Sequence, residues 1–524
     1  MEGAVLYSSF RTFFCLVCYS TKENLSLVYP NLKCCILDPP KFLSWARDNC
    51  PNGIFAFHIG SKIFNVATDT TLVDRILATR KEFQLSHQPL TWLFMHRLFG
   101  ISCMNREKYF DTCEELDSFY TYLVKEPYVD TVFTKISQCL QTNIPQMITF
   151  LDNKVDLQSW ERWASSKYIS SSETEISLMP LLYDMMGSTL VTSIFGSAFS
   201  EKYPDLMHNI YEMERGIKFL TMGIPAWFPW PNNVKAHMFR NMILLSLDDY
   251  QQALDNKIKN KPNGILWGDL DDVSEFVLAR HRFYNEKKIR VEERFEIETL
   301  WNLTINANLL VFWHILFIYS TPGLVEKIRK EISLYASVTQ GIKIGQIAEI
   351  PRVSLSTKML FKECPLLKAS YLETLRLTNQ KWSIRAIEND VRIPKGDSFS
   401  RSLLSSLKKG QYIVVLKKPQ IMDSLYMEYP EKFIPERFLL HNQVKSPSVN
   451  MDTSHFSRCG EISSSIGNEF LERACLSFVA GVIACWDLEP IDKTCEWKIP
   501  DQLIFSGICR PAYDVRVRIK RRCT

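Results

Sequence analysis

Apolar residues recur three and four positions apart through the middle of the chain, the spacing typical of helices that bury one face. The spacing is clearest in three stretches: 179–195, 238–254 and 295–319. Helix breakers divide these stretches, namely Gly196, the prolines within 225–231 and the Pro-Asn-Gly run at 262–264. The pattern therefore predicts helices almost without interruption from Arg106 to about Ala336.

Alternation of apolar and polar residues predicts strands before and after this helical region. Segments 53–59 and 62–67 alternate around Gly60-Ser61, which predicts a β-hairpin. Later, a compact helix is expected at 366–377. Three short alternating segments follow it: 382–387, 390–394 and 410–416. The order of these elements indicates a mainly α protein with a small β part.

The apolar stretch at 300–319 is long enough to raise the question of a membrane span. It contains three Asn and one His, and charged helices follow it, so a buried core helix is expected instead. Asn306 and Asn308 lie in its middle among apolar residues. Buried amides need hydrogen-bond partners, so these two side chains either pair internally or face a cavity.

The chain is expected to form one large domain at 52–520 after an N-terminal segment at 1–51. Residues 4–19 are apolar, but Arg11 interrupts them, and a membrane span needs about 20 apolar residues. No convincing transmembrane span is therefore predicted there.

Charge and cysteine content narrow the function classes. The chain has 62 basic and 58 acidic residues and a net charge of +4, which gives no argument for a nucleic-acid partner. The basic tail at 516–522 is expected to be a solvated end strand, with a peripheral membrane contact as the alternative. The 15 cysteines lack disulfide or metal-ligand spacing, which favours a reducing compartment.

Glu373 and Arg376 stand three positions apart on the helix predicted at 366–377, so they share one face. Leucines flank them, which indicates that this helix is largely buried, and a buried ion pair needs a further partner. Arg437, in the Pro-Glu-Arg-Phe turn at 435–438, is the expected third member.

A loop with spaced glycines runs from His455 to Phe470, and an apolar helix is predicted at 471–486. Together with Glu-x-x-Arg and Pro-Glu-Arg-Phe in this order, the loop resembles that of the cytochromes P450. The resemblance spans about 52–518. It implies a triangular, mostly helical body with small N-terminal and C-terminal sheets, and a buried charged triad of Glu373, Arg376 and Arg437.

The resemblance also implies a cofactor site. Haem would lie at the loop that contains Phe456, Gly460 and Gly467, and Arg385 would hold a haem propionate, with a surface cation as the alternative for Arg385. The central helix with Asn306 resembles that of one branch of the family, which contains prostacyclin synthase, bile-acid-forming sterol hydroxylases and fungal secondary-metabolite members. That branch has Asn where most other members have an acid in an acid–Thr pair.

The loop departs from the family at the cysteine that ligates iron. Aligning on Gly467 places Ser465 there, aligning on Gly460 places Ser464, and aligning on Phe456 places Ser463. A serine hydroxyl stays protonated near neutral pH, whereas a thiolate donates the electron density that favours O–O cleavage. Cys459 lies well before all three serines, so we do not expect it to replace the ligand.

Four functions remain open at this point, of which a structural or scaffold role outside catalysis has the least support in the sequence. The first is a non-redox isomerase or cyclase, or a binding role, acting on a lipophilic terpenoid, sterol or polyketide intermediate without a metal ligand. Asn306, Asn308 and Thr304 would then stabilise polar groups. The second is a haem-dependent monooxygenase supplied with NADPH electrons by a cytochrome P450 reductase, and the third is an inactive pseudo-enzyme. The expected location is cytoplasmic or peripheral at the endoplasmic reticulum membrane.

Overall fold

A computed structural model describes fourteen segments of the chain. They are 54–59, 62–67, 85–263, 267–339, 343–344, 347–348, 350–379, 382–394, 404–416, 428–440, 443–444, 461–491, 496–503 and 507–522. The segment 1–51 lies outside them, as do Phe456, Cys459 and Gly460.

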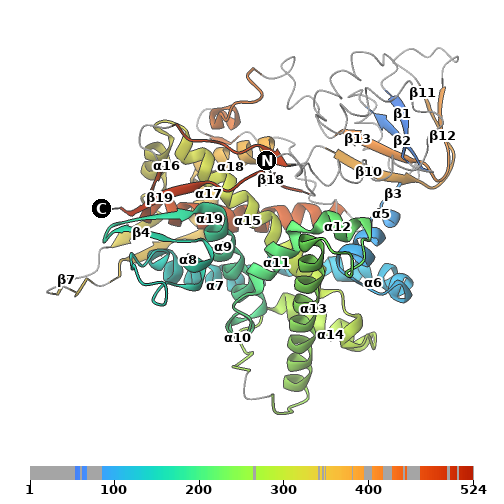
Figure 1. Cartoon of the computed structure of the whole chain (residues 1–524), viewed down its shortest axis with the longest axis horizontal. Helices are drawn as coiled ribbons and strands as arrows, with labels where there is room; N and C mark the ends of the chain where they lie inside the picture. Colours follow the sequence, from blue (N-terminus) through green and yellow to red (C-terminus); the bar gives the residue numbers. More distant parts are fainter. Residues whose placement is uncertain are drawn as a thin grey trace.

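Helices make up most of the described structure (Figure 1). The α-helices are α5 Gln88–Leu93, α6 Arg106–Ser118, α7 Tyr128–Asn143, α8 Ser159–Trp163, α9 Leu178–Phe195, α10 Ser197–Lys202, α11 Leu206–Arg215, α12 Ile217–Met222, α13 Pro231–Ile258, α14 Glu275–Glu286, α15 Glu296–Ser320, α16 Leu324–Ile332, α17 Thr357–Glu363, α18 Pro365–Thr378 and α19 Glu461–Cys485. Shorter helical segments are η2 Phe94–Leu98, η3 Cys103–Asn105, η4 Phe119–Leu123, η5 Ile144–Gln146, η6 Val291–Glu293 and η8 Pro435–Phe438.

The strands form several small sheets. They are β1 Ile54–Ile59, β2 Lys62–Ala67, β3 Leu85–Ser86, β4 Lys167–Ser170, β5 Glu173–Ser177, β6 Ala336–Thr339, β7 Lys343–Ile344, β8 Ile347–Ala348, β9 Arg352–Leu355, β10 Trp382–Ile387, β11 Val391–Pro394, β12 Leu404–Leu407, β13 Tyr412–Leu416, β14 Leu439–Leu440, β15 Gln443–Val444, β16 Trp486–Pro490, β17 Gln502–Leu503, β18 Arg510–Pro511 and β19 Arg516–Arg521. The five-stranded sheet has the order β1-β2-β13-β10-β3, and a four-stranded sheet has the order β16-β19-β5-β4.

The predicted hairpin is confirmed, because β1 and β2 pair antiparallel and Ile59 faces Lys62 across the turn. β13 then joins β2 in parallel, so the sheet unites the start of the described chain with its last third. The predicted mainly α character with small sheets is also confirmed.

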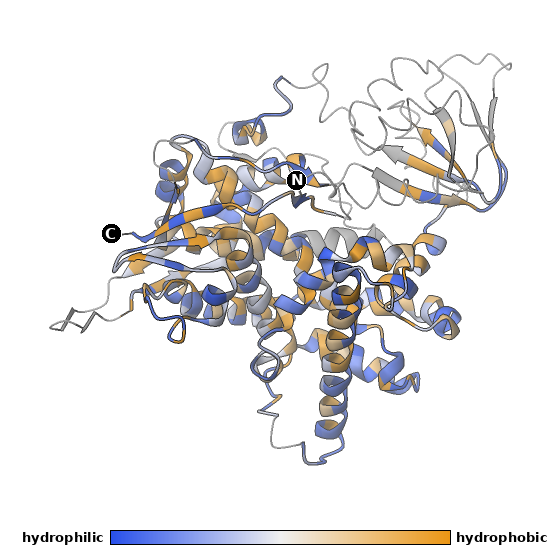
Figure 2. Cartoon of the chain, in the orientation of Figure 1, coloured by the Kyte–Doolittle hydropathy of each residue, from blue (hydrophilic) through white to orange (hydrophobic). Residues whose placement is uncertain are grey.

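α15 is the centre of the helical body. Almost all of its side chains are buried, and it packs against α9, α18 and α19. Among the described residues, α9 and α15 are the two helices long and apolar enough to cross a membrane, and both are mostly buried inside the protein. The expected core helix at 300–319 is therefore present. Figure 2 shows α13, by contrast, with hydrophilic and apolar residues mixed along its length.

Two expectations about strands were wrong. The region predicted to be helical contains β4 and β5, because β5 pairs with β19 more than 300 positions later, and local spacing cannot show such a partner. The basic tail forms the expected strand, β19, but it is an inner strand of its sheet and its side chains are partly or fully buried rather than solvated. Its charges pair with acids on neighbouring strands: Arg516 with Glu175, Arg518 with Glu173 and Lys520 with Glu489.

The helix predicted at 471–486 begins earlier, at Glu461, and ends at Cys485. Ser463, Ser464, Ser465 and Gly467 therefore belong to the first turns of α19 and not to a loop. The apolar run that suggested a start at Leu471 is the part of the helix that the core buries, from Phe470 onward.

Candidate active site and charged cluster

Glu373 and Arg376 lie one turn apart on α18, and both side chains are fully buried. Two parallel hydrogen bonds join them. Arg376 Nε donates to Glu373 Oε2 at 2.7 Å, and its Nη2 donates to Oε1 at 2.8 Å. Such a bidentate contact is both strong and geometrically specific. The predicted i, i+3 spacing thus produces an ion pair inside the core.

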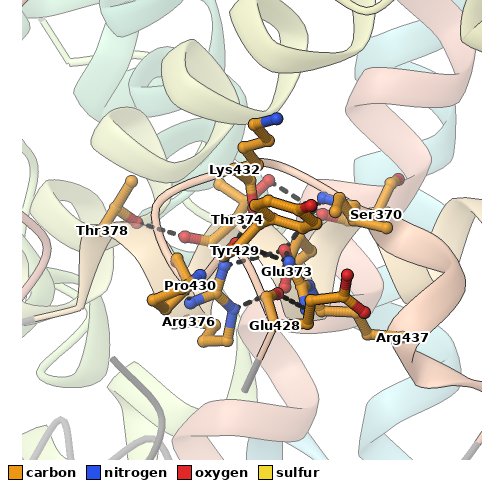
Figure 3. A network of polar contacts seen from close by, with 11 residues as sticks. Ser370, Glu373, Thr374, Arg376, Thr378, Glu428, Tyr429, Pro430, Lys432 and Arg437 are labelled. Atoms are coloured by element: carbon orange, nitrogen blue, oxygen red, sulfur yellow. Dashed lines mark hydrogen bonds and ion pairs between the residues drawn. The ribbon is translucent and has the colours of Figure 1, made fainter. Parts of the chain in front are cut away.

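Arg437 reaches the same carboxylate from η8, the 3₁₀ helix at Pro435–Phe438. Its Nε lies 3.3 Å from Glu373 Oε1, which also accepts the Ile434 N–H at 2.9 Å. Figure 3 shows the three charged side chains converging at α18. The remaining N–H groups of the two arginines donate to carbonyls of the same segment: Glu428, Tyr429, Pro430 and Lys432.

The cluster therefore ties a loop to a helix. Each guanidinium group is bonded to the Glu373 carboxylate and to backbone carbonyls, and buried charges need such partners. The expected convergence of Glu373, Arg376 and Arg437 is present in the structure.

Asn306 lies against the turn that precedes β18. Its Oδ1 accepts the Ile508 N–H at 3.2 Å, and a Cβ added to Gly507 would stand 2.4 Å from the same oxygen. Two helical turns further along α15, Trp313 Nε1 donates to the Cys509 carbonyl at 2.7 Å. α15 thus holds the 507–509 turn at two points. The Asn306 amide nitrogen donates to no residue that the structure describes, so it stays available as a donor.

Asn308 and Thr304 lie on a different face of α15. Residues two apart on a helix point in nearly opposite directions, whereas residues four apart share a face. Asn308 faces Gly187 of α9 and is completely buried, with both amide atoms lacking hydrogen-bond partners in the described structure. Thr304 donates its hydroxyl to the Leu300 carbonyl. The structure therefore does not gather Asn306, Asn308 and Thr304 around one space.

Sequence reasoning missed two buried polar groups near α15. His314 Nε2 lies 2.7 Å from Ser370 Oγ, and burial lowers the pKa of this histidine to about 3. Since Ser370 donates to the Leu367 carbonyl, the histidine is the donor in this pair. The His314–Ser370 pair bonds α15 to α18.

Glu214 of α11 is the second group. Its carboxylate accepts the Tyr183 hydroxyl at 2.8 Å, and Arg510 Nη1 stands 4.0 Å away. Burial raises the pKa of Glu214 to about 7, against the opposing effects of Arg510 and Tyr183. Glutamate is common on helix surfaces, so a single sequence gives no signal that this one is buried.

Comparison with known proteins finds relatives of one kind. The chain is 22% identical to cytochrome P450 monooxygenase poxD of Penicillium oxalicum over 345 residues, which are 65% of this chain and 63% of that protein. It is 26% identical to rat 25-hydroxycholesterol 7-alpha-hydroxylase over 48% of this chain and 59% of that protein. It is 23% identical to bovine prostacyclin synthase over 55% of this chain and 59% of that protein.

The chain belongs to the cytochrome P450 family. No family model matches it. The chain spans about three fifths of the length of these relatives.

A haem would need a cation for its propionates and a ligand for its iron. Arg385 lies on β10, with its guanidinium buried, and donates to the Ile384 carbonyl. A buried guanidinium fits the expected propionate contact better than the surface-cation alternative.

The iron ligand does not fit. The resemblance would place serine at the ligand position in every alignment register, and the described thiols of α19 are Cys475 and Cys485. Burial raises the pKa of both, that of Cys485 to about 12, so neither supplies a thiolate at neutral pH. These side chains do not fit haem-thiolate ligation.

Proposed function

We propose that this chain is a cytochrome P450-fold protein that binds a lipophilic intermediate and acts on it without haem-thiolate chemistry, as an isomerase, a cyclase or a carrier. The observation that carries the proposal is the serine found at the iron-ligand position in all three registers. A hard, protonated hydroxyl cannot replace the thiolate push. The proposed fold is the triangular P450 body with its N-terminal and C-terminal sheets.

The retained charged cluster supports a folded, working scaffold. Glu373, Arg376 and Arg437 keep all their partners, although a chain under no selection would be expected to lose buried charge pairs as readily as a cofactor loop. The same observation disfavours the inactive pseudo-enzyme, which remains the third alternative.

Within such a scaffold, Asn306 is the residue we assign to the substrate. Its Oδ1 is held by the Ile508 N–H, which fixes the amide plane and leaves the Nδ2 donors to orient a polar group. Thr304 and Asn308 are less suited to contact the substrate, because the Thr304 hydroxyl is bonded within its own helix and Asn308 faces α9.

The substrate class follows from the family and the core. The names of two relatives refer to a sterol and to prostacyclin formation, both lipophilic compounds. We propose a terpenoid, sterol or polyketide intermediate, with no nucleic-acid partner. The proposed location is cytoplasmic or peripheral at the endoplasmic reticulum membrane.

A haem-dependent monooxygenase is the second candidate. The relatives poxD and the sterol hydroxylase are named for oxidations, and buried Arg385 is the specific observation in its favour. Haem, NADPH and a cytochrome P450 reductase would be required in this case alone.

One experiment separates these candidates. The full chain is expressed with haem supplied, reduced, exposed to CO and examined by absorption spectroscopy. The proposal expects no thiolate-type Soret band, and the appearance of that band would favour the monooxygenase. Conversion of a candidate substrate without NADPH is then the positive test, and binding without conversion identifies a carrier.

A further inference from the structure

A cleft of about 190 Å³ lies between α8, α9 and the segment joining α10 to α11. Asp184, Ser188 and Val191 follow one another at i, i+4 and i+7, so one face of α9 lines it. Buried Met185 and Met207 add apolar wall, while Glu201 stands exposed at the rim. The cleft is therefore an apolar recess with a carboxylate inside.

Asp184 is the unusual member of this lining. Its side chain is only 7% exposed, yet no described residue bonds to its carboxylate or pairs with it as an ion. Burying an unpaired carboxylate is costly, so such groups in proteins normally meet a cation or a donor. Burial raises the pKa of Asp184 to about 7, and nearby Asp205 adds to the increase.

None of the described residues that line the cleft is basic. Lys202, the basic residue of α10, is 2.5 Å from Asp249 and lies over the ring of Trp267. The other charges around the cleft, Glu201 and Asp205, are acidic. When ionised, the Asp184 carboxylate therefore has no cationic partner in the described lining of the cleft.

We infer that this cleft binds a small organic ammonium ion, with the amine on Asp184 and the hydrocarbon part against the methionines. Size supports this class, because an apolar cavity of about 150 Å³ holds one benzene molecule. Trp160 and Tyr203 also line the cleft and add aromatic surface, and the Lys202 ammonium already lies 5.7 Å from the Tyr203 ring centroid.

A bare metal ion fits less well. Among the described residues there is no group of three His, Cys, Asp or Glu side chains arranged to hold one. One carboxylate in an apolar recess suits a cation that brings its own apolar surface. The inference does not depend on the proposed function, since Asp184 belongs to α9 and Asn306 faces the 507–509 turn.

Benzylamine and benzyl alcohol are the matched probes, because they share size and shape and differ in charge. Binding to the full chain is measured by titration calorimetry near about pH 8, where Asp184 is ionised and the amine is protonated. Benzylamine should bind about tenfold or more tightly than benzyl alcohol. Equal affinities would overturn the inference.

Asp184→Asn should remove the preference for the amine and leave benzyl alcohol binding unchanged. Asp205→Asn, which does not line the cleft, is the matched control and should keep the preference. Ser188→Leu fills the cleft without changing its charge, and should abolish binding of both probes even if Asp184→Asn folds poorly. Amine binding that survives both Asp184→Asn and Ser188→Leu would place it elsewhere and reject the site.

Discussion

The Glu373 carboxylate accepts a hydrogen bond at 3.3 Å from Arg437, a residue 64 positions later in the chain. Glu373 is fully buried, and Arg376 occupies its other side. One carboxylate thus pairs with two arginines and accepts the Ile434 N–H as well, while backbone carbonyls take the other N–H groups of the arginines. The contact explains how a helix and a distant loop keep one arrangement.

Glu373→Gln is expected to destabilise the protein by about 3–5 kcal/mol, because it leaves the buried Arg376 charge without its partner. The measurement is the free energy of unfolding in urea. Glu436→Gln is the matched control. Glu436 precedes Arg437 on η8, but its side chain is 54% exposed and its Oε1 lies 3.8 Å from Lys327 Nζ. Its effect should stay below about 1 kcal/mol. Similar losses in both variants would show that the cluster does not stabilise the fold.

Two glycines with left-handed backbone allow a second comparison. Gly507 has φ +89° and Gly410 has φ +82°, but an added Cβ meets Asn306 Oδ1 at 2.4 Å in the first and nothing within 4 Å in the second. Both alanine variants should lose about 1–2 kcal/mol to backbone strain. Gly507→Ala should lose roughly a further 1–3 kcal/mol from the clash.

Urea denaturation of the two variants gives the difference directly. A result in which Gly410→Ala is as unstable as Gly507→Ala would mean that Asn306 moves aside freely. In that case Asn306 would not be fixed in the way that its proposed role requires.

Periodicity was enough to predict α9, α15, α18 and the β1–β2 hairpin, because each is set by contacts within a few residues. The pairing of β5 with β19 could not be seen, since it depends on a partner more than 300 positions away. The charged cluster was expected only because a family motif links Glu373 to Arg437. Without such a motif, nothing marked Asp184 or Glu214 as buried.

Each buried acid contributes stability that falls as the pH rises, whereas buried His314 and His281, with pKa lowered to about 3 and about 4, contribute stability that rises up to about pH 6.5. The pKa of Glu214 is raised from 4.5 to about 7, so the folded protein keeps this proton over a range in which the unfolded chain has lost it. The folded state is therefore favoured below about pH 4.5 and loses that advantage progressively up to about pH 7. Asp184, raised from 3.8 to about 7, acts in the same direction.

Free energies of unfolding measured between about pH 5 and pH 8 check this, with a limit of ~1.4 kcal/mol per pH unit for each proton. Glu214→Gln should flatten the profile and gain relative stability toward pH 8, and Asp184→Asn should do the same independently. Glu436→Gln, an exposed change, should run parallel to the unchanged protein. A difference between Glu214→Gln and the unchanged protein that does not grow between about pH 5 and pH 8 would contradict the buried-acid explanation.

The three serines provide the last prediction, because each is the ligand position in a different alignment register. Ser463→Cys, Ser464→Cys and Ser465→Cys are prepared with haem supplied, and the reduced, CO-bound spectrum of each is compared with that of the unchanged chain. If a lost thiolate is what separates this protein from haem chemistry, the unchanged chain shows no thiolate-type band and one of the three variants gains it, with Ser465→Cys expected. The other two variants control for a cysteine added nearby.

A thiolate-type band in the unchanged chain that disappears in Cys459→Ser would identify Cys459 as the ligand and end the non-redox proposal. A band in none of the variants would show that more than the ligand has been lost, as a helix beginning at Glu461 in place of the loop would explain.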